Sequence, residues 1–239
     1  MGSSCPCHDC PIRCIGIFSS LCDEDLFKIK EFTHQNFYKR RQIIFHEGNS
    51  CQGFYVLRSG RVKLIKSHST GRQHIIKLVS PAGIMGEVAV FENTRYVFTA
   101  EAMEDSHICF INKEEFFRFI RERPEIALRM ISILSRELRI TRTQMMDIAL
   151  VDARGRMAGL VLSLAGEYGN SKGNDGMLLG LSLTRNEMAE MIGVSQETAI
   201  RLLSQFKNDG LIRTNRRQIT ILNEERLRMI AGREPALSI

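Results

Sequence analysis

The stretch from Leu183 to Lys207, LTRNEMAEMIGVSQETAIRLLSQFK, determines how the C-terminal part of the chain folds. Thr184 is a helix N-cap candidate, and Glu187 three residues later completes a capping box. The pair predicts a helix over Arg185–Ile192 that ends at Gly193, where a tight turn requires a positive φ angle. A helix with such clear start and stop signals is the first half of a two-helix motif.

A second helix follows the turn. Ser195 is another N-cap candidate and opens a helix over Gln196–Lys207. Helix, glycine-containing turn and helix is the plan of a helix-turn-helix motif, whose second helix reaches base edges in the major groove. Arginine suits guanine, glutamate accepts from cytosine and glutamine pairs with adenine. The predicted DNA-binding residues of this motif are Thr184, Arg185, Ser195, Gln196, Glu197, Ile200 and Arg201.

A β-hairpin signal with a basic tip comes next. Two strand-like runs, Leu211–Arg213 and Gln218–Ile221, flank Thr214–Arg217. Arg216 and Arg217 are therefore expected to contact DNA phosphates as the tip of a wing. The alternative is a winged helix that contacts protein, with Arg201 on a solvated face. The helix caps, the glycine turn, the apolar core and the basic hairpin all fit a DNA-binding winged helix, so DNA is the favoured partner.

The periodicity of apolar residues divides the rest of the chain. Short runs rich in Val, Ile and Phe between Phe37 and Asn112 predict an antiparallel sandwich or jelly roll. From Lys113 to Val151 the period becomes helical. Glycines from Gly166 to Gly180 then predict a loop. The apolar stripe of the helical part consists of Ile126, Met130, Leu134, Leu138, Thr141, Met145 and Ile148. It predicts a coiled-coil-like seam of a homodimer, with ordinary core packing as the alternative.

Composition excludes several classes of protein. The chain has 239 residues, of which 44% are hydrophobic and 25% charged, which excludes wholesale disorder and collagen-like repeats. The net charge of +6 permits a polyanionic partner. No apolar run approaches the roughly 18 residues that span a bilayer, and the N-terminus lacks a secretory signal, so a cytoplasmic protein without a membrane partner is expected. The sequence contains no Ser-His-Asp set, P-loop or HExxH motif, so it gives no indication of an enzyme.

The chain has seven cysteines, and their crowding near the N-terminus indicates metal or redox chemistry in a reducing compartment. Cys7, Cys10 and Cys14 with the distant Cys109 supply four thiolates, the number that an iron–sulfur cluster requires. Two alternatives stay open. The N-terminal set can bind zinc, because thiolates suit zinc equally well. The cysteines can also be unliganded, with Cys109 a buried core thiol.

Four segments together resemble the cyclic-AMP receptor protein and fumarate-nitrate reduction regulator (CRP/FNR) family of bacterial transcription factors. They are Phe45–Gly48, Phe54–Gly60, Gly86–Phe91 and Leu183–Leu203. The resemblance extends from about Phe18 to Gly232. It implies an α+β protein with an N-terminal β-roll of the cyclic-nucleotide-binding type, a long dimerisation helix and a C-terminal winged helix-turn-helix. The implied divisions are a Cys-rich segment over 1–22, a β-roll sensor domain over 23–112, a dimerisation region over 113–151 and a DNA-binding domain over 152–239.

The resemblance also implies partners and base-reading positions. The expected partners are a second copy of the chain, RNA polymerase and a near-palindromic DNA duplex, on which two recognition helices lie about one turn apart. Glu197 and Arg201 match two base-reading positions of the family. Ile200 stands where the FNR branch typically has serine, so the half-site of that branch does not carry over.

Two effector sites follow from the resemblance. In the cyclic-AMP-binding members a Gly-Glu segment holds the ribose and an Arg-Ser pair holds the cyclic phosphate. Gly86 and Glu87 match the first, and Arg95 matches the arginine, but Tyr96 stands where the serine would be. Half of the phosphate cradle is therefore missing.

The second site is the cysteine cluster. In oxygen-sensing FNR proteins three N-terminal cysteines and one cysteine late in the β-roll hold a [4Fe-4S] cluster, and Cys109 lies on the matching strand. The gap to the third cysteine is shorter here, so Cys5 or Cys22 can replace Cys14 as a ligand.

These observations favour a DNA-binding regulator gated by a redox, oxygen or related gas signal through a cluster. The alternatives are the same regulator gated by a small molecule in the β-roll, or by no cofactor. An iron–sulfur electron-transfer protein is disfavoured by the helix-turn-helix motif.

Overall fold

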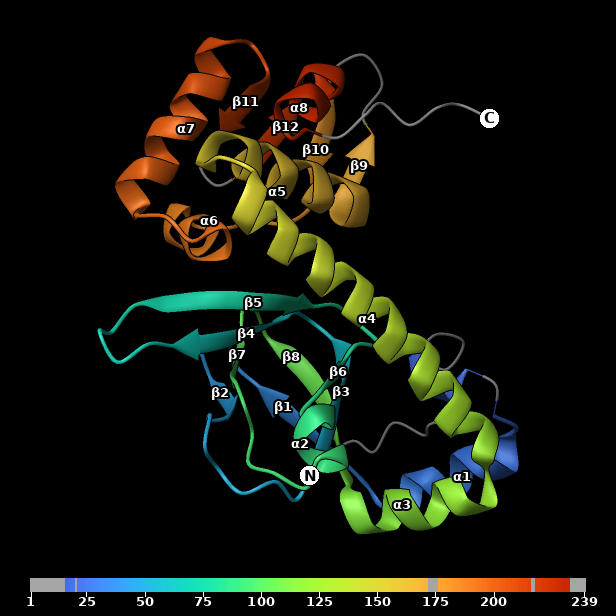
Figure 1. Cartoon of the computed structure of the whole chain (residues 1–239). Helices are drawn as coiled ribbons and strands as arrows, with labels where there is room; N and C mark the ends of the chain where they lie inside the picture. Colours follow the sequence, from blue (N-terminus) through green and yellow to red (C-terminus); the bar gives the residue numbers. More distant parts are fainter. Residues whose placement is uncertain (1–15, 20, 172–175, 216–217, 233–239) are drawn as a thin grey trace. The chain divides into compact units, whose positions relative to one another are not determined.

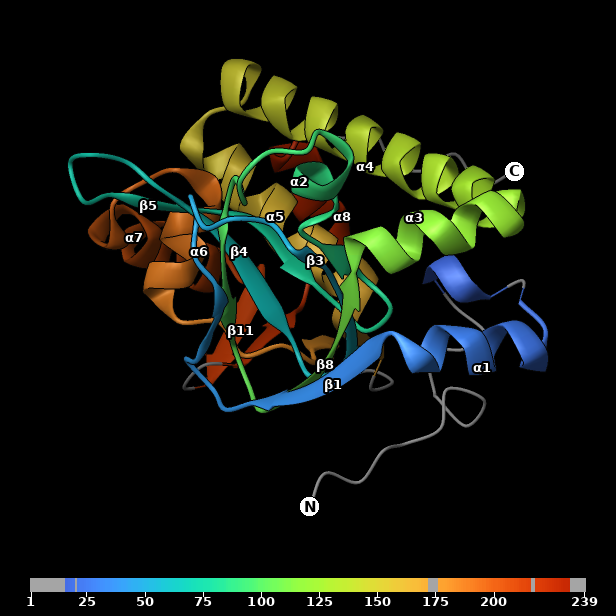
Figure 2. The ribbon, with the colours of Figure 1, turned by 90° about the horizontal axis from the view of Figure 1, so that it is seen from below.

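The computed structural model describes residues 16–19, 21–171, 176–215 and 218–232 (Figures 1 and 2). The chain divides into two compact units, Met1–Leu138 and Arg139–Ile239. Each unit is built around its own small antiparallel sheets.

Two four-stranded antiparallel sheets form the first unit. One sheet has the order β1-β8-β3-β6 and consists of Thr33–Tyr38, Ser106–Asn112, Gly53–Ser59 and Ile84–Met85. The other has the order β2-β7-β4-β5 and consists of Ile43–Phe45, Thr99–Ala102, Val62–Ser67 and Gln73–Val79. The predicted β-roll is confirmed, because the short Val- and Ile-rich runs are strands whose apolar side chains meet in one core.

Helices close one side of this core. The described part begins with a 3₁₀ turn, η2 (Gly16–Phe18), and continues with α1 (Asp23–Glu31), while α2 (Glu87–Phe91) follows β6. Helix α3 (Lys113–Glu122) begins at Asn112, whose side chain accepts from the N–H groups of the first turn. Its buried Phe116 meets Phe54 of β3 edge-on, with 4.7 Å between ring centroids. Helices α1 and α3 lie side by side at one end of the sheets (Figures 1 and 2).

The predicted helical region is broken once. Arg123 has a non-helical conformation (φ −132°, ψ 72°) between α3 and α4 (Pro124–Leu150). The residue before a proline is disfavoured in the helical region, so the break falls where Pro124 starts the next helix. None of the helices in the described part of the chain has both the length and the hydropathy that a membrane span needs.

Helix α4 carries two apolar stripes, and the sequence prediction had merged them. Ile126 and Met130 are buried in the β-roll core, and Ile133 packs against it. The first two positions of the predicted dimer seam are therefore internal packing, and this part of the prediction was wrong. A separate stripe is half-buried or exposed and has the alternating three- and four-residue steps of a heptad pattern. It consists of Ile131, Leu134, Leu138, Thr141, Met145 and Ile148.

The second unit combines helices with a small sheet. Helices α5 (Ala153–Tyr168), α6 (Arg185–Ile192), α7 (Gln196–Asn208) and α8 (Glu224–Ile230) accompany a sheet of order β11-β12-β10-β9. Its strands are Ile212–Asn215, Gln218–Ile221, Met177–Leu179 and Gly169–Ser171. The glycine-rich stretch was predicted as a loop, but it contributes β9 and β10, which pair through Gly169 and Leu179. The strand β10 also pairs with β12, which is distant in the sequence, so the glycines alone could not indicate a strand here.

The exposed stripe of α4 predicts a helix–helix seam between two copies of the chain. Leu138→Glu puts a charge into that seam in both copies and is expected to weaken association by about 2 kcal/mol or more, since a buried leucine is lost and a carboxylate is desolvated. Sedimentation as a function of concentration measures the change. Leu150→Glu is the matched control, because Leu150 is 77% exposed and lies off the stripe. A Leu138→Glu protein that dimerises like the parent would place the seam elsewhere.

Candidate functional site

The start of the helix-turn-helix has the predicted capping geometry. Thr184 Oγ1 accepts the Glu187 N–H at 3.1 Å, and Glu187 Oε2 accepts the Thr184 N–H at 2.8 Å, which closes the capping box of α6. Helix α6 ends at Gly193, which has φ 70°. A β-carbon is strained in this left-handed conformation, so the turn favours glycine.

Helix α7 is held by a second cap and by a shared core. Ser195 Oγ accepts the Thr198 N–H at 3.2 Å. Val194 in the turn is half-buried. The buried side chains that pack α6 and α7 are Ala189, Ile192, Ala199, Leu202, Leu203 and Phe206. The core fixes which side of α7 faces outward.

The outward side of α7 carries the predicted base-reading residues. Gln196, Glu197, Ile200 and Arg201 are exposed and lie on one face of the first two turns. Among the described residues, Glu197 and Arg201 make no ion pair. This face is therefore available to an external partner.

The other predicted DNA contacts differ in role or lie outside the description. The hydroxyls of Thr184 and Ser195 are engaged in the two helix caps. Arg185 is half-buried beside Met188, and burial lowers the pKa of its guanidinium. The wing is present as β11 and β12, with Asn215 opposite Gln218. Arg216 and Arg217 at its tip lie outside the described residues.

In the β-roll, Tyr96 fills space beside Gly86. A β-carbon at Gly86, which has φ 84°, would lie 2.8 Å from the Tyr96 ring. The Tyr96 hydroxyl donates to the Gly53 carbonyl at 2.7 Å, and the side chain is buried. The residue that stands in place of the expected serine is therefore a fixed part of the roll.

Glu87 is buried, with 7% of its surface exposed. Its Oε2 atom has no hydrogen-bond partner among the described residues. Burial raises the pKa of this carboxyl, and the nearby Lys77 ammonium partly offsets the rise. An unsatisfied buried carboxylate oxygen is costly, so the position of Glu87 lowers the stability of the folded roll.

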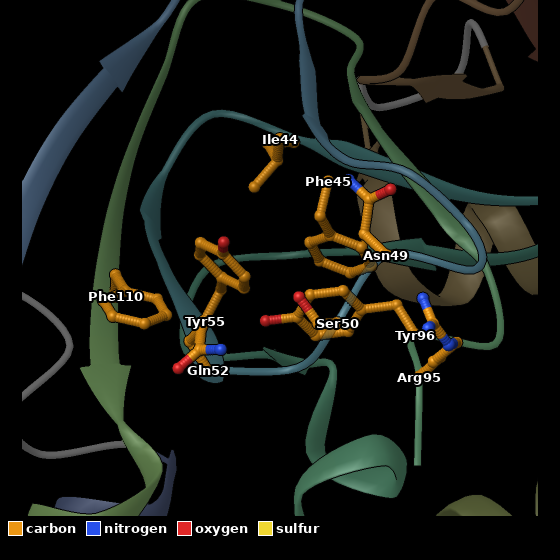
Figure 3. Close-up of a pocket in the computed structure, with 9 residues that line it drawn as sticks. All are labelled: Ile44, Phe45, Asn49, Ser50, Gln52, Tyr55, Arg95, Tyr96 and Phe110. Atoms are coloured by element: carbon orange, nitrogen blue, oxygen red, sulfur yellow. The ribbon is translucent and has the colours of Figure 1, made fainter.

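Arg95 is the third residue of the expected effector pocket. Its guanidinium is exposed and donates to the Gly48 carbonyl at 2.8 Å. It lines a cavity of about 450 Å³ that Gly86 and Glu87 do not line. Figure 3 shows the rings of Phe45 and Tyr96 facing each other between Tyr55 and Arg95. The other residues around the cavity are Ile44, Asn49, Ser50, Gln52 and Phe110.

Cys109 is half-buried on β8, between Gln35 of β1 and Val56 of β3. Side chains two residues apart share a strand face, so Cys109 lies on the same face as Ile111, opposite Phe54. This is the face that α3 covers. Cys7, Cys10 and Cys14 lie outside the described residues, as does Cys5.

The remaining cysteine near the N-terminus has a protein partner. The exposed Cys22 thiol donates to Asp25 Oδ2 at 3.2 Å, and Asp25 is ion-paired with Arg123 at 2.7 Å. In the described part of the chain, no three metal-ligating side chains come together.

Two charged residues near Glu87 were missed at the sequence level. Lys77 of β5 forms an ion pair and hydrogen bond with Glu137 of α4, and both act on the Glu87 carboxyl. Lys77 is two residues before the buried Val79, so the two side chains share a face of the strand. The sequence alone does not show which residues of the neighbouring strand they face.

Comparison with known proteins agrees with this arrangement. The cyclic nucleotide-binding domain family matches residues 35–123. The Crp-like helix-turn-helix domain family matches residues 155–230, which include α6, α7 and the wing. The chain belongs to the CRP/FNR family of transcription regulators. Members of this family are dimeric DNA-binding regulators and not enzymes, and DNA binding resides in the helix-turn-helix.

Relatives from two branches of the CRP/FNR family are similarly distant. The CRP-like cAMP-activated global transcriptional regulator of Mycobacterium tuberculosis is 28% identical over 190 residues, covering 80% of this chain and 84% of that protein. Transcriptional activator protein Anr of Pseudomonas aeruginosa is 24% identical over 227 residues, covering 95% of this chain and 92% of that protein. The fold matches the c-di-GMP-responsive regulator CLP of Xanthomonas campestris with a TM-score of 0.75 at 20% identity, over 84% of this chain and 99% of that chain.

Glu87 predicts a distinct dependence of stability on pH. Its folded-state pKa is raised above the usual value of 4.5, so the folded protein binds this proton more tightly than the unfolded protein. The contribution to the unfolding free energy is present at low pH and is lost as pH rises through the raised pKa. The loss is at most about 1.4 kcal/mol per pH unit. Urea unfolding at several pH values measures it.

Glu87→Gln should remove this slope and unfold less readily than the parent at neutral pH. Glu92→Gln is the control, since Glu92 follows the same helix and is exposed. An unchanged slope in Glu87→Gln would assign the pH dependence to other groups.

Proposed function

We propose that this CRP/FNR-family regulator binds a near-palindromic DNA site as a homodimer in the cytoplasm, and that an oxygen or redox signal controls binding through a [4Fe-4S] cluster on its cysteines. The observation that carries the DNA part is the exposed N-terminal face of α7. The capped, glycine-linked core beneath it fixes the orientation of that face.

Base reading is assigned to Glu197 and Arg201. They are one helical turn apart, so both side chains point to the same groove. Arg201 offers two parallel donors to guanine O6 and N7, and Glu197 accepts from cytosine N4. Gln196 and Ile200 flank this pair and adjust base preference, while the arginines of the wing are assigned to phosphates.

The exposed stripe of α4 supports the dimer. A seam through Leu138 and Met145 relates two copies by a twofold axis, and a twofold protein matches a palindromic site. A bound dimer at a promoter makes RNA polymerase the expected protein partner.

Cys109 and the start of the described chain support the cluster. The backbone of Gly16 packs against Ala82, and the Ala82 N–H donates to the Leu57 carbonyl at 2.7 Å. Leu57 pairs with Ile108, the neighbour of Cys109. Cys14 is two residues before Gly16, a reach of at most about 7 Å. Gly16, two residues after Cys14 in the sequence, therefore lies close to the β3–β8 pair that contains Cys109.

The chemistry of the donor set fits the cluster. When bound, a [4Fe-4S] cluster supplies an oxygen-sensitive group held by four thiolates. Cys109 anchors that group to β8, which leads directly into α3. A tie between the N-terminal segment and β8 biases DNA binding only if the two arrangements of the dimer hold it unequally. Cys22 is the less suited substitute for Cys14, because its thiol is engaged with Asp25.

A second candidate is control by a small molecule in the β-roll, or by zinc or no cofactor at the cysteines. The buried, unsatisfied Glu87 beside Gly86 favours the small molecule, since a ligand hydroxyl would satisfy Oε2. Tyr96, fixed against Gly86, disfavours the cyclic phosphate.

Arg201→Ala is expected to weaken binding to the cognate duplex by about 1–3 kcal/mol and to relax base choice at one position of each half-site. The reason is the loss of a bidentate guanine contact. Competition binding against duplexes with single base changes measures both effects. Lys207→Ala is the control, because it removes a positive charge from the far end of α7. If Arg201→Ala lowered specific and non-specific binding equally, Arg201 would contact only phosphate.

Cys109→Ala is expected to abolish both the visible absorption of anaerobically purified protein and the oxygen sensitivity of DNA binding. It removes one of four proposed ligands and keeps a small side chain at this half-buried position. Iron and sulfide analysis, absorption spectra and DNA binding with and without air are the measurements. Cys51→Ala is the matched control, since Cys51 is buried before β3 and donates to Gly53. A Cys109→Ala protein that keeps its chromophore and its oxygen response contradicts the cluster assignment.

A further inference from the structure

Lys77 is a charged residue in a row of core side chains. Across the second sheet, Lys77 lies opposite Leu64, and Leu64 lies opposite Ala100. Ala100 in turn lies opposite Phe45. The last three are buried in the core cluster of the roll. Cross-strand partners share a face, so Lys77 extends from the core-facing side of β5.

Glu137 meets Lys77 from α4. It continues the stripe that packs α4 onto the roll, because Ile126, Met130, Ile133 and Glu137 follow each other at three- and four-residue steps. The Lys77 ammonium donates to Glu137 Oε1, and both side chains are about 30% exposed. This ion pair joins α4 to β5 one turn beyond the last apolar residue of α4 that packs against the core.

Glu87 is a second carboxylate on which the charge of the same ammonium acts. Lys77 and Glu137 are the charged groups that act on it, with opposite signs, and its own Oε2 lacks a partner among the described residues. The charge of Lys77 therefore acts on two carboxylates, one on α4 and one on α2. In the observed arrangement the α4 carboxylate holds it.

We propose that Lys77 is a two-position latch that binds either Glu137 of α4 or Glu87 of α2, and thereby sets how firmly α4 is fixed to the β-roll. In the closed position Lys77 holds Glu137 and leaves Glu87 unsatisfied. In the open position Lys77 satisfies Glu87 and releases α4. The two positions exchange one ion pair for another, so neither leaves the ammonium unpaired.

The latch is placed to act on the exposed stripe of α4. Glu137 is the immediate neighbour of Leu138, which is 51% exposed on that stripe. A helix released from β5 is free to rotate or bend at this turn and to change the surface that it offers to a second copy. The inference rests on the proposed function only in taking DNA affinity as the output.

Three substitutions separate the two positions of the latch. Lys77→Met and Glu137→Gln each break the closed position, whereas Glu87→Gln removes the competitor and favours it. Glu101→Gln is the matched control, because the Lys63–Glu101 pair (3.2 Å) belongs to the same sheet, is no more exposed, and joins β4 to β7 rather than to α4. All four proteins are studied as full-length chains.

Hydrogen exchange of the α4 amides, followed by mass spectrometry without DNA, reports the latch itself. Faster exchange around Glu137 is expected in Lys77→Met and Glu137→Gln, slower exchange in Glu87→Gln, and parental exchange in Glu101→Gln. Exchange that is unchanged in the first two variants, or faster in Glu87→Gln as well, would overturn the latch.

Affinity for a duplex selected by the parent protein from a randomised pool reports the coupling to DNA. Lys77→Met and Glu137→Gln should shift the Kd in one common direction by at least about fivefold, and Glu87→Gln in the opposite direction. A protein that carries both Lys77→Met and Glu137→Gln should match the two single variants, because each substitution removes the same contact. Equal affinity in all proteins would overturn the regulatory role. If the parent selects no duplex, the proposed function fails, and the exchange experiment alone decides the latch.

Discussion

Helix α4 carries two apolar stripes, of which one packs on the β-roll and the other stays exposed. The arrangement of the first unit depends on this division. The near end of α4 covers the open side of the β-roll through Ile126 and Met130, which are buried with Phe116 and Phe54. A second stripe, led by Ile131, stays exposed. Both stripes advance in steps of three and four residues, so they lie side by side on different faces of the same helix. The roll fixes the rotation of α4, and that rotation decides which residues remain for a partner.

The helix-turn-helix could be predicted in detail because its signals are local. Thr184 and Glu187 lie within one helical turn, and Gly193 fixes the conformation of a single residue. The core of the motif is formed by residues that are close in sequence, such as Ala189 and Ala199. The exposed face of α7 then follows by elimination. Which base each side chain reads depends on the groove, so those roles stay predictions.

Features that depend on distant pairing could not be predicted in the same way. The period of apolar residues in α4 predicts a stripe, but only packing on the β-roll shows that Ile126 belongs to one stripe and Ile131 to another. The glycine-rich stretch looks like a loop until β10 pairs with β12. Lys77 resembles any surface lysine until the register with Leu64 places it on the core side. The position of Arg95 could not be predicted for the same reason, since only the folded chain shows that it lines a cavity that Glu87 does not line.

The charged contacts at the roll have a physical consequence for regulation. A purely apolar contact between α4 and the roll would have one best packing, because side chains interdigitate and resist displacement. A lysine between two carboxylates has two arrangements with similar pairing, and their balance responds to small changes nearby. Tyr96 is fixed against Gly86, and the Lys77 charge offsets part of the effect of burial on the Glu87 carboxyl. In the proposed latch, control of α4 requires no phosphate from a ligand, since the chain carries both the cation and its two competing anions. A signal at Cys109 on β8, the strand that leads into α3 and then α4, would need only to bias that choice.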